Sequence, residues 1–363
     1  MWPFLRPDSI QVLGDEKCRR SLSRYFDVFN DRKQAKFQLA KKLAAEFTEN
    51  ESNADLWEQH QKLTEEYLSF EAKADRRDID LEDIEQPKRS YLDLKIEIAN
   101  RILSECHLCE RNDKPNRLAG DVGFCRCGTE PVVSTFFEHM GEEPELVPSG
   151  TIFTLGCTLR CLHCQNWTIS QWFESGEILS IEQLSRIVEK LRRGGCRNAN
   201  LVGGEPTPWL KHWLEVFRLT TVNVPVVWNS NSYYSLEVAR LLAGFSDVYL
   251  LDFKYGPRKC ADRISSAPRY WDVCTRNHLV AAKYGELIIR VLVLPQHLEC
   301  CTKPILRWIA ENLGVDVRVN IMFQYRPEWR AYEIPELGRR LTREERSRAL
   351  ELAKEAGLRN YIT

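Results

Sequence analysis

The sequence predicts an α/β fold: a partial (β/α)6 barrel that follows an N-terminal helical extension and a small cysteine-rich segment. Six short apolar runs each precede a segment with helical spacing, at residues 151–155, 199–202, 225–228, 248–251, 287–294 and 317–323. Strand–helix units in sequence favour a parallel sheet with right-handed crossovers. Six units are fewer than the eight of a closed β/α barrel, so we expect an open barrel.

The chain divides by composition into three parts. Residues 1–88 form a charged helical extension, in which 31–47 and 56–67 have helical spacing and strong helix formers, and 75–88 is a charge-rich loop or linker. Residues 89–147 form the cysteine-rich segment, and 148–363 form the barrel. The extension is interpreted as a solvated helical cap, with a docking surface for a partner protein as the alternative.

Local signals mark the helices of the barrel. Ser180 with Gln183 forms a capping box, and the helix that it begins ends at Gly194 and Gly195. Ser235 begins a helix that ends near residue 244. Thr342 with Glu345 begins the last helix, which ends near residue 357.

Composition indicates a cytoplasmic enzyme. The 363 residues carry a formal charge of −1 and are 43% hydrophobic, which argues against nucleic acid and acidic membranes as partners. No apolar run is long enough to span a bilayer, and the first residues lack the apolar core of a signal peptide. The thirteen cysteines cluster at metal-ligand spacings, which is typical of a reducing compartment.

The most informative motif is Cys157, Cys161 and Cys164, spaced C-x3-C-x2-C. Three local thiolates suit a 4Fe–4S cluster and leave its fourth iron without a protein ligand. A structural zinc site or unrelated core cysteines are the alternatives, but a structural zinc site requires four ligands.

Polar and glycine residues follow each predicted strand, where β/α barrels place their active sites. We expect these residues to bind a cofactor: Gly203, Gly204, Glu205, Pro206, Asn229, Asp252, Lys254, Arg290 and His297. Arg290 lies in an apolar strand, so it is expected to meet an anion. For His297, a solvated or structural role is equally open. Asp252 and Lys254 have an ordinary ion pair as their alternative.

A second cysteine group precedes the barrel. Two close pairs, Cys106 with Cys109 and Cys125 with Cys127, suit zinc or a second iron–sulfur cluster, with His107 as a substitute ligand. The adjacent thiols at 300 and 301 are interpreted as buried structural groups, with a role on the substrate side as the alternative. The remaining four are interpreted as incidental: Cys18, Cys196, Cys260 and Cys274.

The cysteine motif resembles the signature of the radical S-adenosylmethionine (SAM) superfamily. From residue 91 to 357 the chain is similar to homologues of the pyruvate formate-lyase activating enzyme. The matching stretches are 118–125, 137–144, 156–171, 202–208, 227–231, 247–256, 270–278, 300–304 and 320–327.

The resemblance implies a fold of radical SAM type, with SAM on the open iron and held near residues 203–205. It also implies reductive cleavage of SAM to a 5′-deoxyadenosyl radical that removes hydrogen from a peptide or protein, as in glycyl-radical activation. An electron donor such as flavodoxin or ferredoxin is then expected. The chain departs from the family at Asn112 and Asp113, where a further cysteine is usual.

Three other functions remain open at the level of sequence. A radical SAM C-methyltransferase of peptides or proteins would need a further cofactor such as cobalamin, and no cobalamin-binding run is visible. An RNA-modifying radical SAM enzyme would need a basic surface. A non-catalytic iron–sulfur or zinc protein leaves the residues that follow the strands without a role.

Overall fold

A computed structural model of the chain describes residues 5–363, which are built around one nine-stranded mixed sheet. The strand order is β3-β1-β2-β4-β5-β6-β7-β8-β9. The parallel strands are β2 (Ser149–Thr154), β4 (Asn198–Gly203), β5 (Val226–Ser230), β6 (Val248–Asp252), β7 (Glu286–Leu292), β8 (Arg318–Met322) and β9 (Tyr361–Ile362). Two antiparallel strands, β1 (Val132–His139) and β3 (Glu177–Ile178), complete one edge.

The sheet confirms the six predicted strands and adds three others. The predicted strands are β2, β4, β5, β6, β7 and β8, and they lie next to one another in chain order. The sheet is open, with β3 and β9 at its edges, which agrees with an incomplete barrel. The sequence analysis did not predict β1, β3 or β9.

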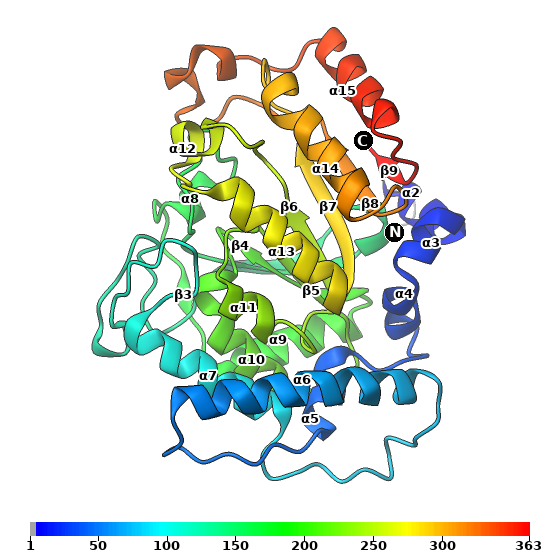
Figure 1. Cartoon of the computed structure of the whole chain (residues 1–363), viewed down its shortest axis with the longest axis vertical. Helices are drawn as coiled ribbons and strands as arrows, with labels where there is room; N and C mark the ends of the chain where they lie inside the picture. The colour runs from blue at the N-terminus through cyan, green and yellow to red at the C-terminus, as the bar shows by residue number, and fades with distance from the viewer. Residues whose placement is uncertain (1–4) are drawn as a thin grey trace.

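Helices cover the outer face of the barrel strands (Figure 1). The capping boxes at Ser180 and Thr342 are both present and begin α9 and α15. Gly195 has a φ of 101°, in the left-handed region, one residue beyond the end cap of α9. The helices of this half are α8 (Trp167–Ser170), α9 (Ile181–Arg193), α10 (Leu210–Leu219), α11 (Leu236–Leu241), α12 (Cys260–Ser265), α13 (Tyr270–Tyr284), α14 (Lys303–Asn312) and α15 (Arg343–Glu355).

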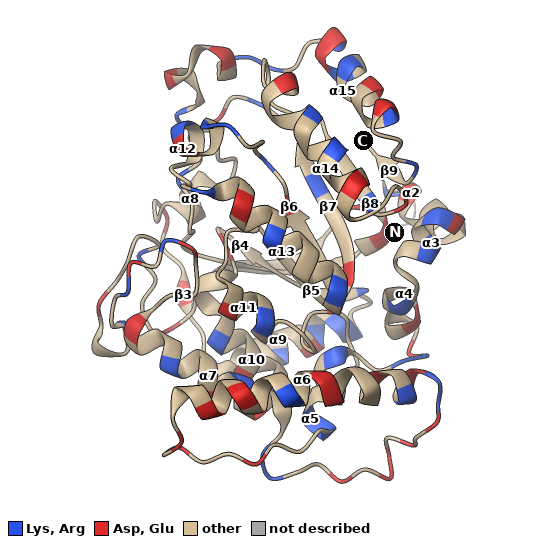
Figure 2. Cartoon of the chain, in the orientation of Figure 1, with Lys and Arg blue, Asp and Glu red and all other residues tan. Residues whose placement is uncertain are grey.

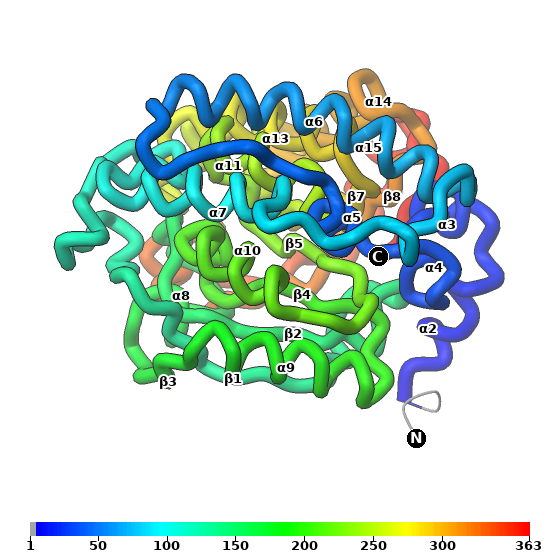
Figure 3. Tube along the Cα trace, turned by 90° about the horizontal axis from the view of Figure 1, so that it is seen from below, coloured from blue at the N-terminus to red at the C-terminus, as the bar shows by residue number. Residues whose placement is uncertain are grey.

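Residues 8–102 contribute a second set of helices, which lie across the bottom and along one side of the molecule in Figure 1 and are seen from below in Figure 3. They are α2 (Asp8–Gln11), α3 (Glu16–Ser21), α4 (Ser23–Phe29), α5 (Lys36–Lys42), α6 (Asn53–Asp75) and α7 (Tyr91–Ile102). Phe37, Leu56, Tyr67 and Leu92 are fully buried in the same apolar cluster as the barrel core, with α7 against α10. The extension therefore shares its core with the barrel.

The predicted helix at 31–47 is shorter in the structure. It is confirmed only for α5, because residues 43–45 leave the helix to pair with 89–91. The amide of Ala45 donates to the carbonyl of Arg89 at 3.0 Å, and the amide of Tyr91 donates to that of Leu43 at 2.8 Å. A tertiary pairing thus overrides local helix propensity.

Two segments close the barrel at the amino ends of its strands. Tyr25 and Phe26 of α4 pack against Val227, Leu250 and Ile288 in a buried apolar cluster. The connection from β1 to β2 includes the 3-10 turn η4 (Pro144–Leu146) and delivers carboxylates to basic strand residues. We call α4 and residues 142–146 the barrel floor.

Short 3-10 turns complete the described chain, at Val12–Gly14, Leu103–Glu105, Arg117–Ala119, Thr207–Trp209, Ala331–Glu333 and Pro335–Leu337. Among residues 5–363, no helix is both long and apolar enough to cross a bilayer. Basic and acidic side chains are interspersed along α15, whereas acidic side chains outnumber basic ones on α6 (Figure 2).

Candidate functional site: a cysteine-lined cavity at the carboxyl ends of the strands

A cavity of about 230 Å³ opens at the carboxyl ends of the barrel strands. Most of the predicted residues line it: Cys157, Cys161, Cys164, Gly203, Gly204, Glu205, Asn229, Asp252, Lys254 and Arg290. Pro206 and His297 are not among its lining residues. The topology therefore brings residues from five strand ends and the loop after β2 to one place.

The three cysteines lie on the loop that follows β2. The Leu159 amide donates to Cys157 Sγ at 3.4 Å, and Asn231 Nδ2 donates to the same sulfur at 3.5 Å. Burial raises the pKa of all three thiols, that of Cys164 to about 11. These thiols become thiolates by binding a metal, and N–H groups directed at a sulfur are what an iron–sulfur ligand accepts. The donor set fits a 4Fe–4S cluster.

Two glycines allow the loop after β4 to lie in close contact with the end of β2 and the cysteine loop. A Cβ on Gly204 would lie 2.2 Å from the carbonyl oxygen of Gly156, and one on Gly203 would lie 2.3 Å from that of Thr154. Gly203 also has a φ of 135°, which side chains disfavour. Glycine at both positions therefore leaves backbone exposed to the cavity beside the cysteines.

Glu205 holds this loop to the neighbouring strand. Its carboxylate accepts hydrogen bonds from Thr207 Oγ1 at 2.5 Å, from Ser230 Oγ at 2.7 Å and from the Asn231 amide at 2.9 Å. Burial nevertheless raises the pKa of Glu205 above its ordinary value. Its hydrogen bonds position the loop after β4, while its edge still lines the cavity.

The other side of the cavity presents donors to a ligand. Lys254 Nζ pairs with Asp252, and although burial lowers the pKa of Lys254, Asp252 and the nearby Cys161 raise it overall. Lys254 thus stays protonated. Asn229 Nδ2 is buried without a hydrogen-bond partner and belongs to a residue that lines the cavity, as a ligand-binding amide would.

Arg290 meets anions of the chain itself. Its Nε donates to Glu143 Oε1 at 2.7 Å, its Nη2 donates to Oε2 of the same residue at 2.7 Å, and it also pairs with Glu142. Its remaining Nη1 donates to Asn229 Oδ1 at 3.1 Å. The expected anion is therefore internal, and Arg290 orients Asn229. The sequence analysis did not identify Glu142 or Glu143 as residues of this site.

The second cysteine group lies beside the barrel. Cys106 Sγ accepts from Arg117 Nη1 at 3.8 Å, and the Cys127 thiol donates to the carbonyl of Cys125 at 3.5 Å. A hydrogen bond from Cys127 lowers the pKa of Cys125 to about 6. In the described part of the chain no three of these four residues bring their sulfurs within 4.8 Å of one another. A zinc ion or second cluster here stays a prediction.

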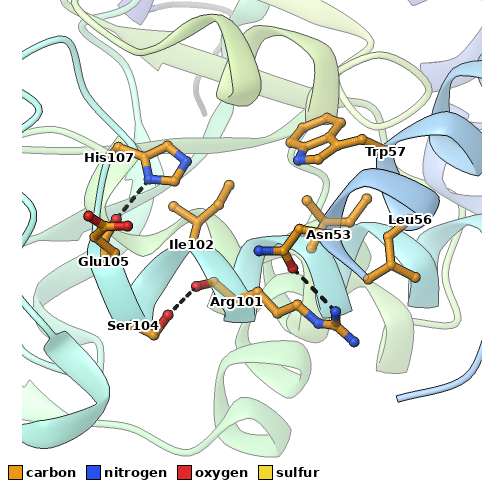
Figure 4. Close-up of a pocket in the computed structure, with 9 residues that line it drawn as sticks. Asn53, Leu56, Trp57, Arg101, Ile102, Ser104, Glu105 and His107 are labelled. Carbon is orange, nitrogen blue, oxygen red and sulfur yellow. Dashed lines mark hydrogen bonds between the residues drawn. The ribbon is translucent and has the colours of Figure 1, made fainter. Parts of the chain in front are cut away.

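His107 lines a pocket that none of the four cysteines lines. Figure 4 shows it at a surface pocket between α6 and α7, where its Nδ1 donates to the carbonyl of Glu105 at 2.7 Å. Trp57, Ile102 and Arg101 line the same pocket.

The sequence of residues 151–309 matches the model of the Radical SAM superfamily. The range begins in β2 and ends in α14, so it includes the cysteine loop and every cavity residue up to Leu292. Residues 151–309 therefore form a domain of the radical SAM superfamily. Members of this superfamily are enzymes that use SAM and a 4Fe–4S cluster, and the three thiols described above fit the cluster.

Two curated relatives come from Methanocaldococcus jannaschii (strain ATCC 43067 / DSM 2661 / JAL-1 / JCM 10045 / NBRC 100440). "Uncharacterized protein MJ0674" is 44% identical over 343 residues, which cover 93% of this chain and 98% of the relative. "Uncharacterized protein MJ0808" is 34% identical over 119 residues, which cover 28% of this chain and 35% of the relative.

Among solved structures, Streptococcus suis SuiB bound to precursor peptide SuiA has a TM-score of 0.39 and 15% identity, over 56% of this chain and 46% of SuiB. SuiB bound to S-adenosylmethionine has a TM-score of 0.38 and 16% identity, over 57% of this chain and 48% of SuiB. The matched region thus spans about half of SuiB.

Proposed function

We propose that Cys157, Cys161 and Cys164 hold the 4Fe–4S cluster and that the rest of the cavity holds SAM for reductive cleavage. The observation that carries this proposal is the convergence of the three thiols with Lys254 and Asn229 on one cavity. When bound, the cluster supplies the electron that converts SAM into methionine and a 5′-deoxyadenosyl radical. Lys254 suits the SAM carboxylate, while backbone at 203–204 suits its amino group.

The substrate is proposed to be a peptide or protein. The cavity has a volume of only about 230 Å³, so the cluster and SAM would fill it and the substrate would approach from outside. Three aromatic side chains lie beside the cavity residues: Trp167 stacks on Trp329 with ring centroids 6.4 Å apart, and Phe173 packs edge-on against both. Phe173 is 65% exposed, which suits contact with a polypeptide.

Within that class, we propose hydrogen abstraction from a glycine of a partner protein. A glycine Cα has no side chain to keep it from the cavity mouth, so an extended loop could present it to the radical. The proposed electron donor is a flavodoxin or ferredoxin.

The test is anaerobic turnover. The reconstituted and reduced protein should convert SAM to 5′-deoxyadenosine, and Cys161→Ala should not, while Cys196→Ala, a buried cysteine far from the cavity loop, should behave as wild type. With an extract of source cells labelled by glycine deuterated at Cα, deuterium should appear in the 5′-deoxyadenosine.

Two results would contradict these proposals. A fully loaded, reduced protein whose cluster EPR spectrum is unchanged by SAM and which forms no product would overturn the SAM site. Turnover in the labelled extract with no deuterium transfer would overturn glycine as the hydrogen donor and leave SAM cleavage standing.

A further inference from the structure

A second group of metal-ligating side chains lies outside the cavity, on the loops that follow β6 and β7. Cys260, His297, Cys300 and Cys301 each offer one ligand atom, and these atoms all lie within 4.8 Å of one another. The sequence analysis separated these residues, because Cys260 is far from the others along the chain. His297 and Cys301 are buried, while Cys260 and Cys300 are partly buried.

The separations match those of one tetrahedral ion. The sulfur of Cys300 lies 3.8 Å from that of Cys260, 3.9 Å from that of Cys301 and 3.3 Å from His297 Nδ1. Cys301 Sγ lies 3.9 Å from the same nitrogen. Zinc bonds of about 2.3 Å to sulfur and about 2.0–2.1 Å to nitrogen, at tetrahedral angles, place S···S at about 3.8 Å and S···N at about 3.5 Å.

The backbone is built to bring these ligands together. His297 caps the π-helix Leu298–Thr302, which contains Cys300 and Cys301, and the Thr302 amide donates to the His297 carbonyl at 3.2 Å. π-helical turns are rare and concentrate at functional sites. A Cβ on Gly256, in the loop that carries Cys260, would lie 2.1 Å from the Cys300 carbonyl oxygen. Glycine there permits the two loops to touch.

The histidine also has the outer partner typical of a metal ligand. Its other ring nitrogen, Nε2, lies 3.8 Å from a Glu336 carboxylate oxygen and 3.5 Å from Arg263. A carboxylate behind a ligating histidine fixes the ring and its tautomer. Metal binding at Nδ1 needs the neutral imidazole with its proton on Nε2, the nitrogen that faces Glu336.

We propose that Cys260, His297, Cys300 and Cys301 bind one zinc ion as a closed Cys3His structural site. Four protein ligands leave no open position, so the ion has no place for a substrate. It ties α12 to the turn before α14. At its other end, α12 supports the cysteine loop: the carbonyls of Ile264 and Ser265 accept from the amides of Leu162 and Arg160 at 2.9 and 3.0 Å.

Metal analysis of the anaerobically purified full chain tests this site. Cys300→Ser combined with Cys301→Ser should lose one zinc per chain relative to wild type and keep its cluster iron. The matched control, Cys196→Ala, should lose neither. The zinc content of a double variant, Cys125→Ser with Cys127→Ser, shows how much zinc the other cysteine group binds.

A second variant, which keeps all four ligands, tests the site in case the double cysteine variant fails to fold. Glu336→Gln keeps all four ligands and should weaken zinc affinity about 10–100-fold, measured by competition with a chromophoric chelator. With cobalt in place of zinc, wild type should show sulfur-to-cobalt absorption that falls in Cys260→Ser. Equal zinc in wild type and the folded double variant, or loss of a cluster's worth of iron instead of zinc, would overturn the proposal.

Discussion

Lys254 pairs with one carboxylate, Asp252, whereas Arg290 is held by two, Glu142 and Glu143, so Lys254 is the cavity cation better able to bind an anionic ligand group. We expect Lys254→Met to raise the dissociation constant for SAM about 10–100-fold, since a charge-assisted hydrogen bond contributes about 1.5–3 kcal/mol. Equilibrium binding to the reconstituted protein measures this. Lys283→Met, an exposed lysine on α13, is the control, and equal affinities in the two variants would remove Lys254 from the SAM site.

Most residues that line the cavity could be predicted from the sequence, but the residues that bind to them could not. Asn229, Asp252 and Lys254 could be found because each directly follows an apolar run, and parallel strands bring such positions to one edge. Glu143 could not be found in this way. Its partner Arg290 is 147 residues away, and only the folded connection between β1 and β2 brings the carboxylate into the barrel.

At the scale of single elements, the N-terminus of α4 is capped by a carboxylate from a strand of the sheet. Its cap residue Leu22 offers no side-chain acceptor, and Glu286 of β7 accepts instead from the amides of Arg24 and Tyr25 at 2.7 and 2.6 Å. Burial raises the pKa of Glu286 from its ordinary value of 4.5 to about 7, despite these bonds. The cap is therefore a group that titrates near neutral pH.

This titration has a definite sign. Between about pH 4.5 and 7 the native state holds a proton that the unfolded state has released, so the free energy of unfolding falls as pH rises. Relative to Glu286→Gln, which does not titrate, wild type should lose about 2–3 kcal/mol from pH 5 to pH 8. Denaturant unfolding at several pH values measures the difference. The control is Glu66→Gln, at an exposed position. If the difference in unfolding free energy between wild type and Glu286→Gln were as independent of pH as the difference between wild type and Glu66→Gln, the prediction would be contradicted.

Helices and strands could be predicted from the sequence where the pattern that defines them lies within the element itself. The six barrel strands have continuous apolar runs, and two helices of the barrel half, α9 and α15, have complete capping boxes. By contrast, β3 and β9 are two residues long, and residues 43–47 keep helix-forming side chains while pairing with 89–91. Their conformation depends on neighbours distant in sequence, which periodicity does not report.

Over the whole molecule, the N-terminal extension and the barrel share buried side chains. Arg24 illustrates this, since it pairs with Asp75 of α6 and with Asp247 before β6. The boundary at residue 88 expected from composition therefore falls between segments that pack on one core. Charge content predicted a solvated cap because the apolar residues of α4 and α5 are few, although nearly all of them are buried.

A core substitution in the extension should then destabilise the barrel as well. Phe26→Ala is expected to lower the free energy of unfolding by about 3–5 kcal/mol. Far-UV circular dichroism and tryptophan fluorescence should report one shared transition. Tyr332→Ala, at a side chain that is 70% exposed, should change stability by less than about 0.5 kcal/mol. Two separate transitions would show that the extension folds as its own unit.

The barrel floor has a kinetic consequence. Since α4 and residues 142–146 fill the amino end of the barrel, ligands reach the cavity through the carboxyl end. A polypeptide that covers this entrance would trap whatever is beneath it. SAM would therefore have to associate before the polypeptide, and the nucleoside product would dissociate after it, so that an excess of polypeptide slows turnover by blocking exchange.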